Sequence, residues 1–391
     1  MTELTINIPG VRVLRLREWH IDKVIELMNK EGWYYYDHHE LKRYLNLNQD
    51  CFTLLKDEHI IGSIFTTNYG NQAWIGNIIV AKEARGMGLA AKLIRRVIDY
   101  LYENKHVFTF RLGAVPLAIG LYKKVGFHAE AFTTSQEAGL PLKVEHERLN
   151  LGENILVERL ESHDLEAISE IDKRYFKSKR YQFLMNVYND SIKESCFCLK
   201  DQKKIVGFLM LRRRQASKDE GHFAEGPDYA YRLGPSCVLP EYGINGFKAL
   251  LQKAIRAVNE EVDQLGGSAK LYAVFPKNAN KEEIYEDTRK LGKAMGMDTN
   301  IKLDRIFDEH DFLFGAQKSQ KNEEQWKYMK NMGFHQEYFE QVMSYTPREA
   351  LNTRPSERKV DQPGPILKAS LHRRHLVIRR KKPRPLKIKG G

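Results

Sequence analysis

Residues 74–91 read W-I-G-N-I-I-V-A-K-E-A-R-G-M-G-L-A-A. The first seven residues are mostly apolar, which predicts a buried strand, and an amphipathic helix is predicted to begin after the glycines. Glycines between a strand and a helix permit a tight bend and leave backbone N–H groups exposed at the positive end of the helix dipole. The stretch therefore predicts an anion-binding loop of a size that suits a pyrophosphate.

Two common nucleotide-binding loops fit this stretch poorly. The phosphate-binding loop of NTPases requires Lys followed by Ser or Thr after its last glycine, whereas Leu89 and Ala90 stand there. The dinucleotide fingerprint requires a third glycine, but Ala91 occupies that place and no parallel βαβ unit is predicted around it. A different anionic ligand is therefore favoured.

The pattern R-x-x-G-x-A, formed by Arg85, Gly88 and Ala90 after a strand, resembles the acyl-CoA signature of the GNAT superfamily of N-acetyltransferases. The flanking segments follow the order of that superfamily. A hairpin is predicted before the loop and a strand and closing helix after it, over residues 52–55, 60–66, 107–112 and 116–127. The last segment, P-L-A-I-G-L-Y-K-K-V-G-F, carries the superfamily's L-Y-x-x-x-G-F ending.

This resemblance implies an acyl-CoA-dependent N-acetyltransferase that transfers an acetyl or other acyl group from acetyl-CoA to a primary amine by direct attack. The strand before the loop would pair with the amide groups of pantetheine, as an added strand would. The residues implied to bind the acyl-CoA are Ile78, Ile79, Val80, Arg85, Gly86, Met87, Gly88, Leu89 and Ala90. Acetyl-CoA is the expected co-substrate, and no metal is expected.

A lysine-like amine acceptor, with an ordinary pKa of about 10, must lose a proton before it attacks, so a base or a water chain to a base is needed. Superfamily members often carry a carboxylate on the strand before the loop, but Gly76, Asn77 and Ile78 stand in that region. Asn77 could orient a water molecule, with Asp37, Glu40 or a His as the proton acceptor. The resemblance implies that Tyr122 protonates the leaving thiolate, with burial as a packed aromatic as the alternative.

Residues 32–40 read G-W-Y-Y-Y-D-H-H-E. In the superfamily this segment helps to form the wall of the acceptor pocket. The candidate substrate residues are Trp33, Tyr34, Tyr35, Asp37 and Glu40. An equally plain interpretation is that these aromatic residues pack a helix corner. The acceptor, a small molecule or a protein lysine, is left open.

The pattern restarts near Gly152. The stretch R-L-E-S-H-D-L-E-A-I at 159–168 matches R-L-R-E-W-H-I-D-K-V at 15–24 with an offset of 144, and the same offset pairs residues 199–201 with 55–57. After a slip of one residue and a later insertion near 215–228, the match continues through a second loop. The chain is therefore predicted to hold a tandem repeat of one domain.

The second copy departs from the first at the loop, where G-I-N-G-F-K at 243–248 stands in place of R-G-M-G-L-A at 85–90. The Arg is lost and Phe247 enters, which argues against acyl-CoA binding there. With the Y-x-L-G-P pattern of residues 231–235, this looks like the degenerate second domain of bacterial-type tandem acetyltransferases, which supports the first copy. Its closing element is either 291–297 or 328–334, and neither retains the tyrosine of Tyr122.

The expected fold is α/β (α+β), with two tandem GNAT-like domains. Each should have a mixed, mostly antiparallel central sheet flanked by helices, followed by a disordered basic tail. The expected boundaries are 1–150 for the N-terminal acetyltransferase domain, 151–346 for the second domain and 347–391 for the tail. A chain of 391 residues has room for these parts.

The location expected from the sequence is intracellular, either cytoplasmic or nuclear. No run of about twenty apolar residues occurs, and the N-terminus lacks the basic and apolar regions of a signal peptide, so no transmembrane segment is predicted. The four cysteines, Cys51, Cys196, Cys198 and Cys237, do not have a metal-binding spacing. They fit a reducing compartment.

The positive charge is concentrated at the C-terminus. Residues 351–391 hold 13 Lys or Arg and 2 acidic residues, a net charge of +11, which leaves 50 basic and 49 acidic residues in the rest of the chain. Residues 371–391 could bind nucleic acid or another anionic surface, or act as a nuclear address. A solvated tail without a partner is the alternative. The same tail supports a second hypothesis for the whole chain, a non-catalytic GNAT-like module docked to an acidic partner.

Overall fold

A computed structural model of the chain describes residues 3–31, 38–47, 50–144, 149–215, 228–276, 286, 289 and 327–347. Residues 1–353 form one compact unit. The predicted tail at 347–391 lies outside the described residues except for its first residue.

The first half follows the predicted order of elements. Its strands and helices are β1 (Glu3–Leu4), β2 (Val11–Arg15), α1 (Ile21–Lys30), α2 (His38–Leu47), β3 (Phe52–Lys56), β4 (His59–Asn68), β5 (Gln72–Val80), α3 (Leu89–Lys105), β6 (Thr109–Ala114), α4 (Ile119–Val125) and β7 (His128–Leu140). The strand predicted at 107–112 begins two residues late, at Thr109. The reason is that the Val107 N–H donates to the Leu101 carbonyl and closes the end of α3.

The second half repeats this order. Its elements are β8 (Ile155–Arg159), α5 (Leu165–Phe176), α6 (Tyr181–Asn189), β9 (Phe197–Asp201), β10 (Lys204–Gln215), β11 (Tyr229–Val238), α7 (Gly243–Leu265), β12 (Ala269–Pro276) and β13 (His335–Tyr345). Only two strand pairs, β5 with β6 and β11 with β12, are parallel among the described strands. The predicted α/β fold, with a repeated order of elements and a mixed, mostly antiparallel sheet flanked by helices in each half, is therefore confirmed, and the described strands of both halves join in one 13-stranded sheet.

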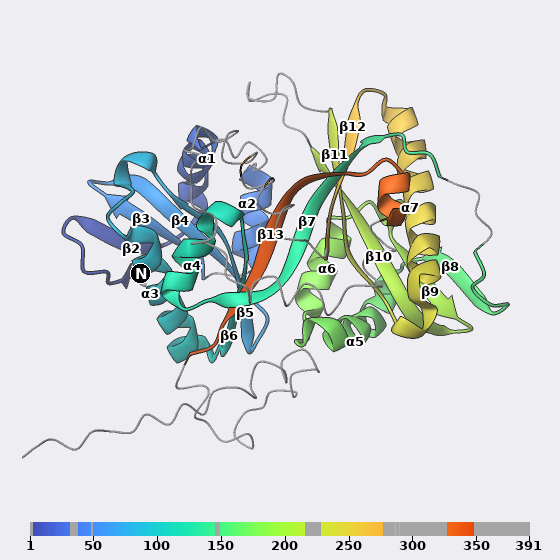
Figure 1. Cartoon of the computed structure of the whole chain (residues 1–391), viewed down its shortest axis with the longest axis horizontal. Coiled ribbons are helices and arrows are strands. Elements are labelled where there is room, and N and C mark those ends of the chain that lie inside the picture. Colours follow the sequence, from blue (N-terminus) through green and yellow to red (C-terminus); the bar gives the residue numbers. More distant parts are fainter. Residues whose placement is uncertain are drawn as a thin grey trace, which may run out of the picture. The chain divides into compact units, whose positions relative to one another are not determined.

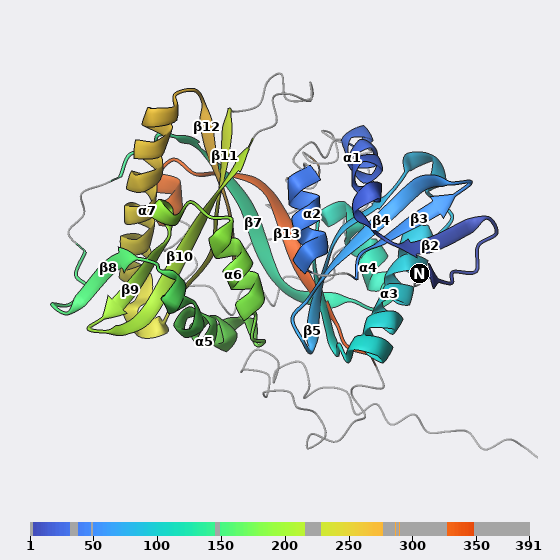
Figure 2. The same cartoon turned by 180° about the vertical axis from the view of Figure 1, so that it is seen from behind.

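Helices cover both faces of the part of the sheet that the first half forms (Figures 1 and 2). Tyr44 of α2 contacts Phe65 edge-on, with ring centroids 6.2 Å apart, while Tyr100 of α3 contacts Phe52 from the other side at 5.4 Å. Helix α3 turns a buried apolar face to the sheet, with side chains spaced three or four residues apart as the sequence predicts. These residues are Leu89, Leu93, Ile94, Val97, Ile98 and Leu101.

The two halves exchange their last strands. The strand order is β1-β2-β3-β4-β5-β6-β13-β7-β12-β11-β10-β9-β8, so β13 lies between β6 and β7, and β7 pairs on its other edge with β12. Figure 1 shows β13 and β7 side by side. Met343 of β13 belongs to the hydrophobic core of the first half, and Ala138 of β7 belongs to the core of the second. Each core is thus completed by a strand from the other half.

Strand pairing fixes the register of the repeat. Gly62 pairs with Val80 in the first half, and Gly207 pairs with Val238 in the second. The Cys51 thiol donates to the Thr66 carbonyl at 3.9 Å, and the Cys196 thiol donates to the Leu211 carbonyl at the same distance. These matches agree with the predicted offset beyond the slip.

One part of the predicted register is wrong. The pairing of residues 199–201 with 55–57 is off by one, because Leu199 pairs with Gly207 just as Leu54 pairs with Gly62. The slip of one residue therefore falls before β3 and β9, within the helical region where an extra residue is tolerated, and not in the hairpin turn.

Candidate functional site

Strands β5 and β6 separate at the centre of the first half. They pair in parallel from Gln72 with Thr109 to Trp74 with Arg111, and β5 then continues to Val80 without a further pair to β6 among the described residues. On its other side, β6 pairs with β13. Backbone groups at the end of β5 are therefore left for another extended partner on that edge.

A β-bulge lies at the point where the strands separate. Ser63 pairs with Ile79 and Phe65 pairs with Gly76, so Asn77 and Ile78 together face one residue of β4. Asn77 adopts a left-handed conformation with φ of +48°, which Asn tolerates better than most residues. The bulge turns the direction of β5 at the residue that the sequence analysis proposed to orient water.

The loop between β5 and α3 has the form of an anion cradle. Gly86 and Gly88 have φ of +83° and +71°, and a Cβ atom at either glycine would meet no atom within 4 Å. Among the hydrogen bonds between described residues, none has a backbone amide of residues 86–91 as its donor. The first intrahelical bond of α3 is donated by Lys92 to the Gly88 carbonyl at 3.1 Å. The loop therefore presents unused N–H groups at a helix N-terminus.

The Arg85 side chain is 49% exposed, but it folds back onto the end of β5. Its Nε donates to the Val80 carbonyl at 3.0 Å, and its Nη2 forms an ion pair with Glu31. Glu31 follows directly after α1, and its side chain is 17% exposed. Glu31 was not predicted to be a site residue, since no sequence spacing links it to Arg85, which is 54 positions away.

Tyr122 lies on α4 and is 8% exposed. Gly126, with φ of +113°, ends this helix, and the amides of Gly126 and Phe127 both donate to the Tyr122 carbonyl. The ring of Tyr345, from the exchanged strand β13, lies 3.0 Å from the point where a Cβ of Gly126 would stand. The helix that carries Tyr122 is thus positioned by a residue of the second half.

Most of the predicted substrate residues cannot be placed. Trp33, Tyr34, Tyr35 and Asp37 lie outside the described residues, and Glu40 lies in α2 with a side chain that is also outside them. The neighbouring His38 is described, and its Nδ1 lies 2.7 Å from a carboxylate oxygen of Asp22.

A polar chain that the sequence analysis missed connects the first sheet to the second half. Arg111 of β6 forms two hydrogen bonds of 2.9 and 3.0 Å with Glu130 of β7 and a third with Gln72 of β5. Gln72 donates onward to the Phe176 carbonyl at the end of α5, at 2.7 Å. The separation of β5 from β6 therefore begins beside a partly buried network of hydrogen bonds. No short sequence motif predicts pairs of residues so far apart in the chain.

Aromatic packing strengthens the same junction. The Tyr69 ring meets the rings of Phe176 and Phe183 edge-on at 4.8 and 5.7 Å, and burial raises the pKa of Tyr69 to about 12. The Arg180 guanidinium lies 4.0 Å from the Phe176 ring centroid and forms a paired hydrogen bond with Asp172. The turn between β4 and β5 is therefore held by the second half.

The equivalent region of the second copy has a different form. Helix α7 begins at Gly243, so the positions that match residues 85–88 already lie in the helix. The Tyr175 hydroxyl donates to the Val238 carbonyl at 3.2 Å, the carbonyl that matches that of Val80. The Phe334 N–H donates to the Met329 carbonyl at 3.1 Å, as Phe127 does to Tyr122, so residues 328–334 match the closing helix. Residues 291–297, the other candidate, lie outside the described residues.

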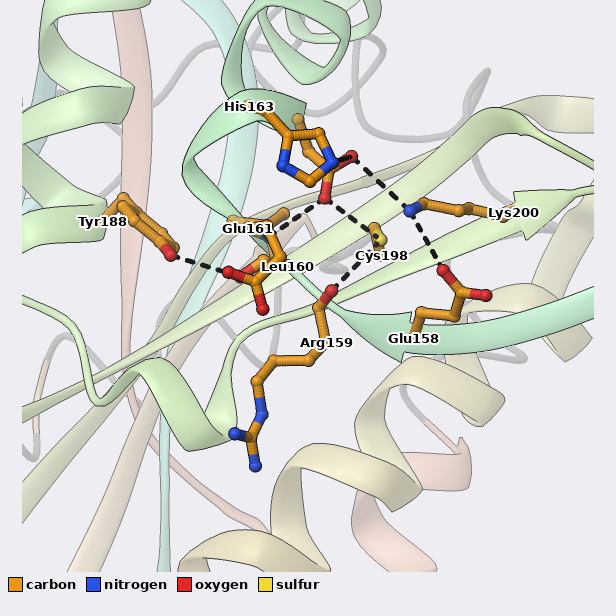
Figure 3. A network of polar contacts seen from close by, with 9 residues as sticks. Glu158, Arg159, Leu160, Glu161, His163, Tyr188, Cys198 and Lys200 are labelled. Atoms are coloured by element: carbon orange, nitrogen blue, oxygen red, sulfur yellow. Dashed lines mark hydrogen bonds and ion pairs between the residues drawn. The ribbon is translucent and has the colours of Figure 1, made fainter.

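A polar cluster at the start of α5 also stands out (Figure 3). Asp164 accepts a hydrogen bond from the Glu161 amide at 3.0 Å and lies 3.5 Å from Lys200, whose ammonium also contacts Glu158 at 3.0 Å. Burial raises the pKa of the nearby Cys198 thiol to about 12. The carboxylate thus caps a helix start, which is a structural role.

In the first copy the matching cap uses a histidine ring in place of the Asp164 carboxylate. The Arg17 amide donates to Nδ1 of His20 at 3.0 Å, and burial lowers the pKa of His20. The described residues hold no group of three His, Cys, Asp or Glu side chains that could bind a metal ion. Among the residues that the structure describes, no helix is long and apolar enough to cross a membrane.

The first half of the chain is similar to known proteins in sequence. Residues 14–127 match the model of the acetyltransferase (GNAT) family. The chain is 29% identical over 116 residues to YitH of Bacillus subtilis, an uncharacterized N-acetyltransferase. That match covers 30% of this chain and spans only about two fifths (40%) of the length of the relative.

Solved structures share the fold over most of the chain. A putative acetyltransferase from Pyrococcus horikoshii has 16% identity and a TM-score of 0.53, with coverage of 88% of this chain and 92% of that one. A GCN5-related N-acetyltransferase from Sphaerobacter thermophilus has 12% identity and a TM-score of 0.54 over 87% and 96% of the two chains. A tandem GNAT protein from the clavulanic acid biosynthesis pathway has 9% identity and a TM-score of 0.50 over 86% and 98%. At these identities the likeness concerns the fold alone.

Proposed function

We propose that residues 14–127, which match the acetyltransferase (GNAT) family model, form a domain that transfers an acetyl or other acyl group from acetyl-CoA to a primary amine. The observation that carries the proposal is the separation of β5 from β6 directly before a loop with unused backbone amides. An extended pantetheine arm can pair with the edge of β5, while the pyrophosphate accepts hydrogen bonds from the loop.

The donor groups assigned by this proposal lie in chain order along one path. The backbone of Ile78, Ile79 and Val80 follows the bulge, and the loop of residues 85–90 comes next. Gly86 and Gly88 are the residues at which the lack of a side chain matters, because both have positive φ and open space beside them. A pyrophosphate can therefore approach the backbone closely.

The test is calorimetric titration with acetyl-CoA, followed by a screen of primary amines and lysine-containing peptides as acceptors. We expect one acetyl-CoA to bind per chain with a dissociation constant in the micromolar range, on the order of −8 kcal/mol. Lack of binding by the intact chain would contradict the proposal. Two molecules bound per chain would instead contradict our further proposal that the second copy is a degenerate, supporting domain.

The proposal for the second copy depends on three differences at matched positions. Its loop is replaced by the first turn of α7. The Val238 carbonyl accepts a hydrogen bond from the Tyr175 hydroxyl. Met329 stands where the first copy has Tyr122. Loss of the loop and of the tyrosine removes two groups that the donor site of the first copy would use, whereas Tyr175 replaces Arg85 as the donor to the matched carbonyl. The contacts of β13 with β6 and of Phe176 with Gln72 give the second copy a supporting role instead.

We propose that the amine attacks the thioester directly, with Asn77 orienting a water molecule and Tyr122 protonating the leaving thiolate. A base is still required to receive the amine proton, and Asp37, Glu40 or a His is retained as the candidate. The acceptor would be held by the segment that contains Trp33, Tyr34, Tyr35, Asp37 and Glu40. This segment follows Glu31, whose carboxylate is tied to Arg85 of the donor loop.

Tyr122→Phe should lower turnover about 100-fold, because general acid catalysis typically contributes 10²- to 10⁴-fold. Acetyl-CoA affinity should change little, because the ring and its contact with Phe127 are kept. Steady-state kinetics with an acceptor from the screen measures the effect. Tyr102→Phe, on the neighbouring α3, is the control and should retain full turnover. Unchanged turnover in Tyr122→Phe would remove this residue from the acid role.

A second candidate function is supported by the charge of the C-terminus, with 13 basic and 2 acidic residues over 351–391. In this hypothesis the chain is a binding module that docks to nucleic acid or another acidic partner. We expect the full chain to bind a DNA or RNA duplex with an affinity that falls steeply as salt rises, because phosphate contacts release counterions. A chain that ends at Thr353, where the compact unit ends, should lose this binding. Equal binding by both chains would exclude the tail as the docking segment.

A further inference from the structure

One backbone carbonyl, at matched positions, has a different hydrogen-bond donor in each of the two copies. In the first copy the Val80 carbonyl accepts a hydrogen bond from Arg85 at 3.0 Å, and Arg85 is tied in turn to Glu31. In the second copy the matching Val238 carbonyl accepts a hydrogen bond from the Tyr175 hydroxyl at 3.2 Å. The offset of 144 that aligns the starts of α1 and α5 also aligns Glu31 with Tyr175. One connection between a helix end and a strand end is therefore made directly in one copy and through Arg85 in the other.

We infer that Glu31 and Arg85 together form a positioning link that holds the donor loop against the end of β5 and the end of α1. This inference rests on the proposed function, because it assigns a role within the donor site. Arg85 is the first residue of the loop, and Val80 is the last residue of the strand that would pair with pantetheine. Because Arg85 bonds both to the Val80 carbonyl and to Glu31, this link sets the distance between the pantetheine edge and the pyrophosphate cradle.

The alternative role for Arg85 is direct binding of a CoA phosphate. The hydrogen bonds favour the positioning role, since Nε is used by the Val80 carbonyl and Nη2 by the Glu31 carboxylate, while 49% of the Arg85 side chain is exposed. A guanidinium neutralised by a carboxylate attracts a phosphate weakly. The two roles predict effects of opposite sign when Glu31 is removed, which makes the inference testable.

The experiment measures acetyl-CoA affinity by calorimetry for the full chain and for Glu31→Ala, Arg85→Ala and the double variant. If Glu31 and Arg85 act as one link, each single variant should weaken binding about ten-fold, the size expected for loss of a charge-assisted hydrogen bond. The double variant should be no weaker than Arg85→Ala, because residues that act as a unit are not additive. If Arg85 binds phosphate, Glu31→Ala should leave binding unchanged or tighten it, which would overturn the inference.

Two control variants separate a donor-site role from general support of the fold. Glu58→Ala removes the partner of Arg12, another Arg–Glu pair, in which both side chains are exposed. Tyr175→Phe removes the matching link of the second copy. Both should keep the affinity of the original chain. Weakened acetyl-CoA binding in Tyr175→Phe would overturn the inference, because the link would then support the fold as a whole. If the original chain does not bind acetyl-CoA, the proposed function fails first, and the two failures are distinguishable.

Discussion

Gly88→Asp should abolish measurable binding of acetyl-CoA. Gly88 precedes α3, and a Cβ there meets no atom within 4 Å, so the carboxylate has room and would stand among the loop amides. Repulsion between two unit charges 4 Å apart is about 4 kcal/mol at an effective dielectric constant of 20, so we expect affinity to fall at least about 100-fold. Calorimetric titration at constant ionic strength measures the change.

Gly88→Asn is the matched control for this variant. Asn has nearly the same shape as Asp and shares its tolerance of positive φ, so both substitutions place similar strain on the backbone. An Asp carboxylate at a helix N-terminus is itself favourable, so neither variant should unfold the domain. We expect Gly88→Asn to lose less affinity than Gly88→Asp, because it adds a side chain of the same shape without the negative charge. Equal loss in both variants would mean that shape and not charge is responsible, and equal retention would place the pyrophosphate elsewhere.

A chain that ends at Phe334 should lose cooperative unfolding, because it lacks β13. This strand pairs with β6 from Phe110 to Ala114 and with β7 along most of its length, so its removal leaves two unpaired edges inside the sheet. It also takes Met343, which is fully buried, out of the first core. Loss of one such side chain costs about 2–5 kcal/mol, a large share of a total stability of about 5–15 kcal/mol.

The control is a chain that ends at Thr353, which keeps β13 and removes the tail. Its thermal unfolding should match that of the full chain. A point substitution provides a milder test. Met343→Ala should lower the free energy of unfolding by about 2–5 kcal/mol, whereas Leu156→Ala, at a side chain that is 56% exposed, should change it by less than about 0.5 kcal/mol. A chain ending at Phe334 that unfolds at the same temperature as the control would show that strand exchange is not needed for stability.

Local features of the chain were predictable from short stretches. The glycines at 86 and 88 predicted a tight bend, and both have positive φ. The apolar spacing along α3 predicted one buried face, which is found. The repeat was also visible, because residues 15–24 and 159–168 preserve the same pattern. Such features depend on neighbours within a few residues, or on a whole pattern that recurs, and both can be read along the chain.

Contacts between distant residues could not be predicted in this way. The insertion of β13 between β6 and β7 depends on which of two similar strands completes each core, and both choices satisfy the same alternating pattern. The slip in the repeat was misplaced for a related reason, since hydrogen-bond register and not letter matching aligns Leu54 with Leu199. The partner of Arg85 was likewise invisible, because an ion pair between a helix end and a loop leaves no spacing in the sequence.

The chain's own order of residues was thus enough to predict a repeated α/β fold and an anion-binding loop, because backbone conformation and helix polarity act over a few residues. The folded arrangement was needed to learn that each core borrows a strand, that Tyr345 supports the helix of Tyr122, and that Glu31 holds Arg85. These three depend on segments far apart in the chain meeting in space, and packing selects among partners that the sequence leaves equivalent.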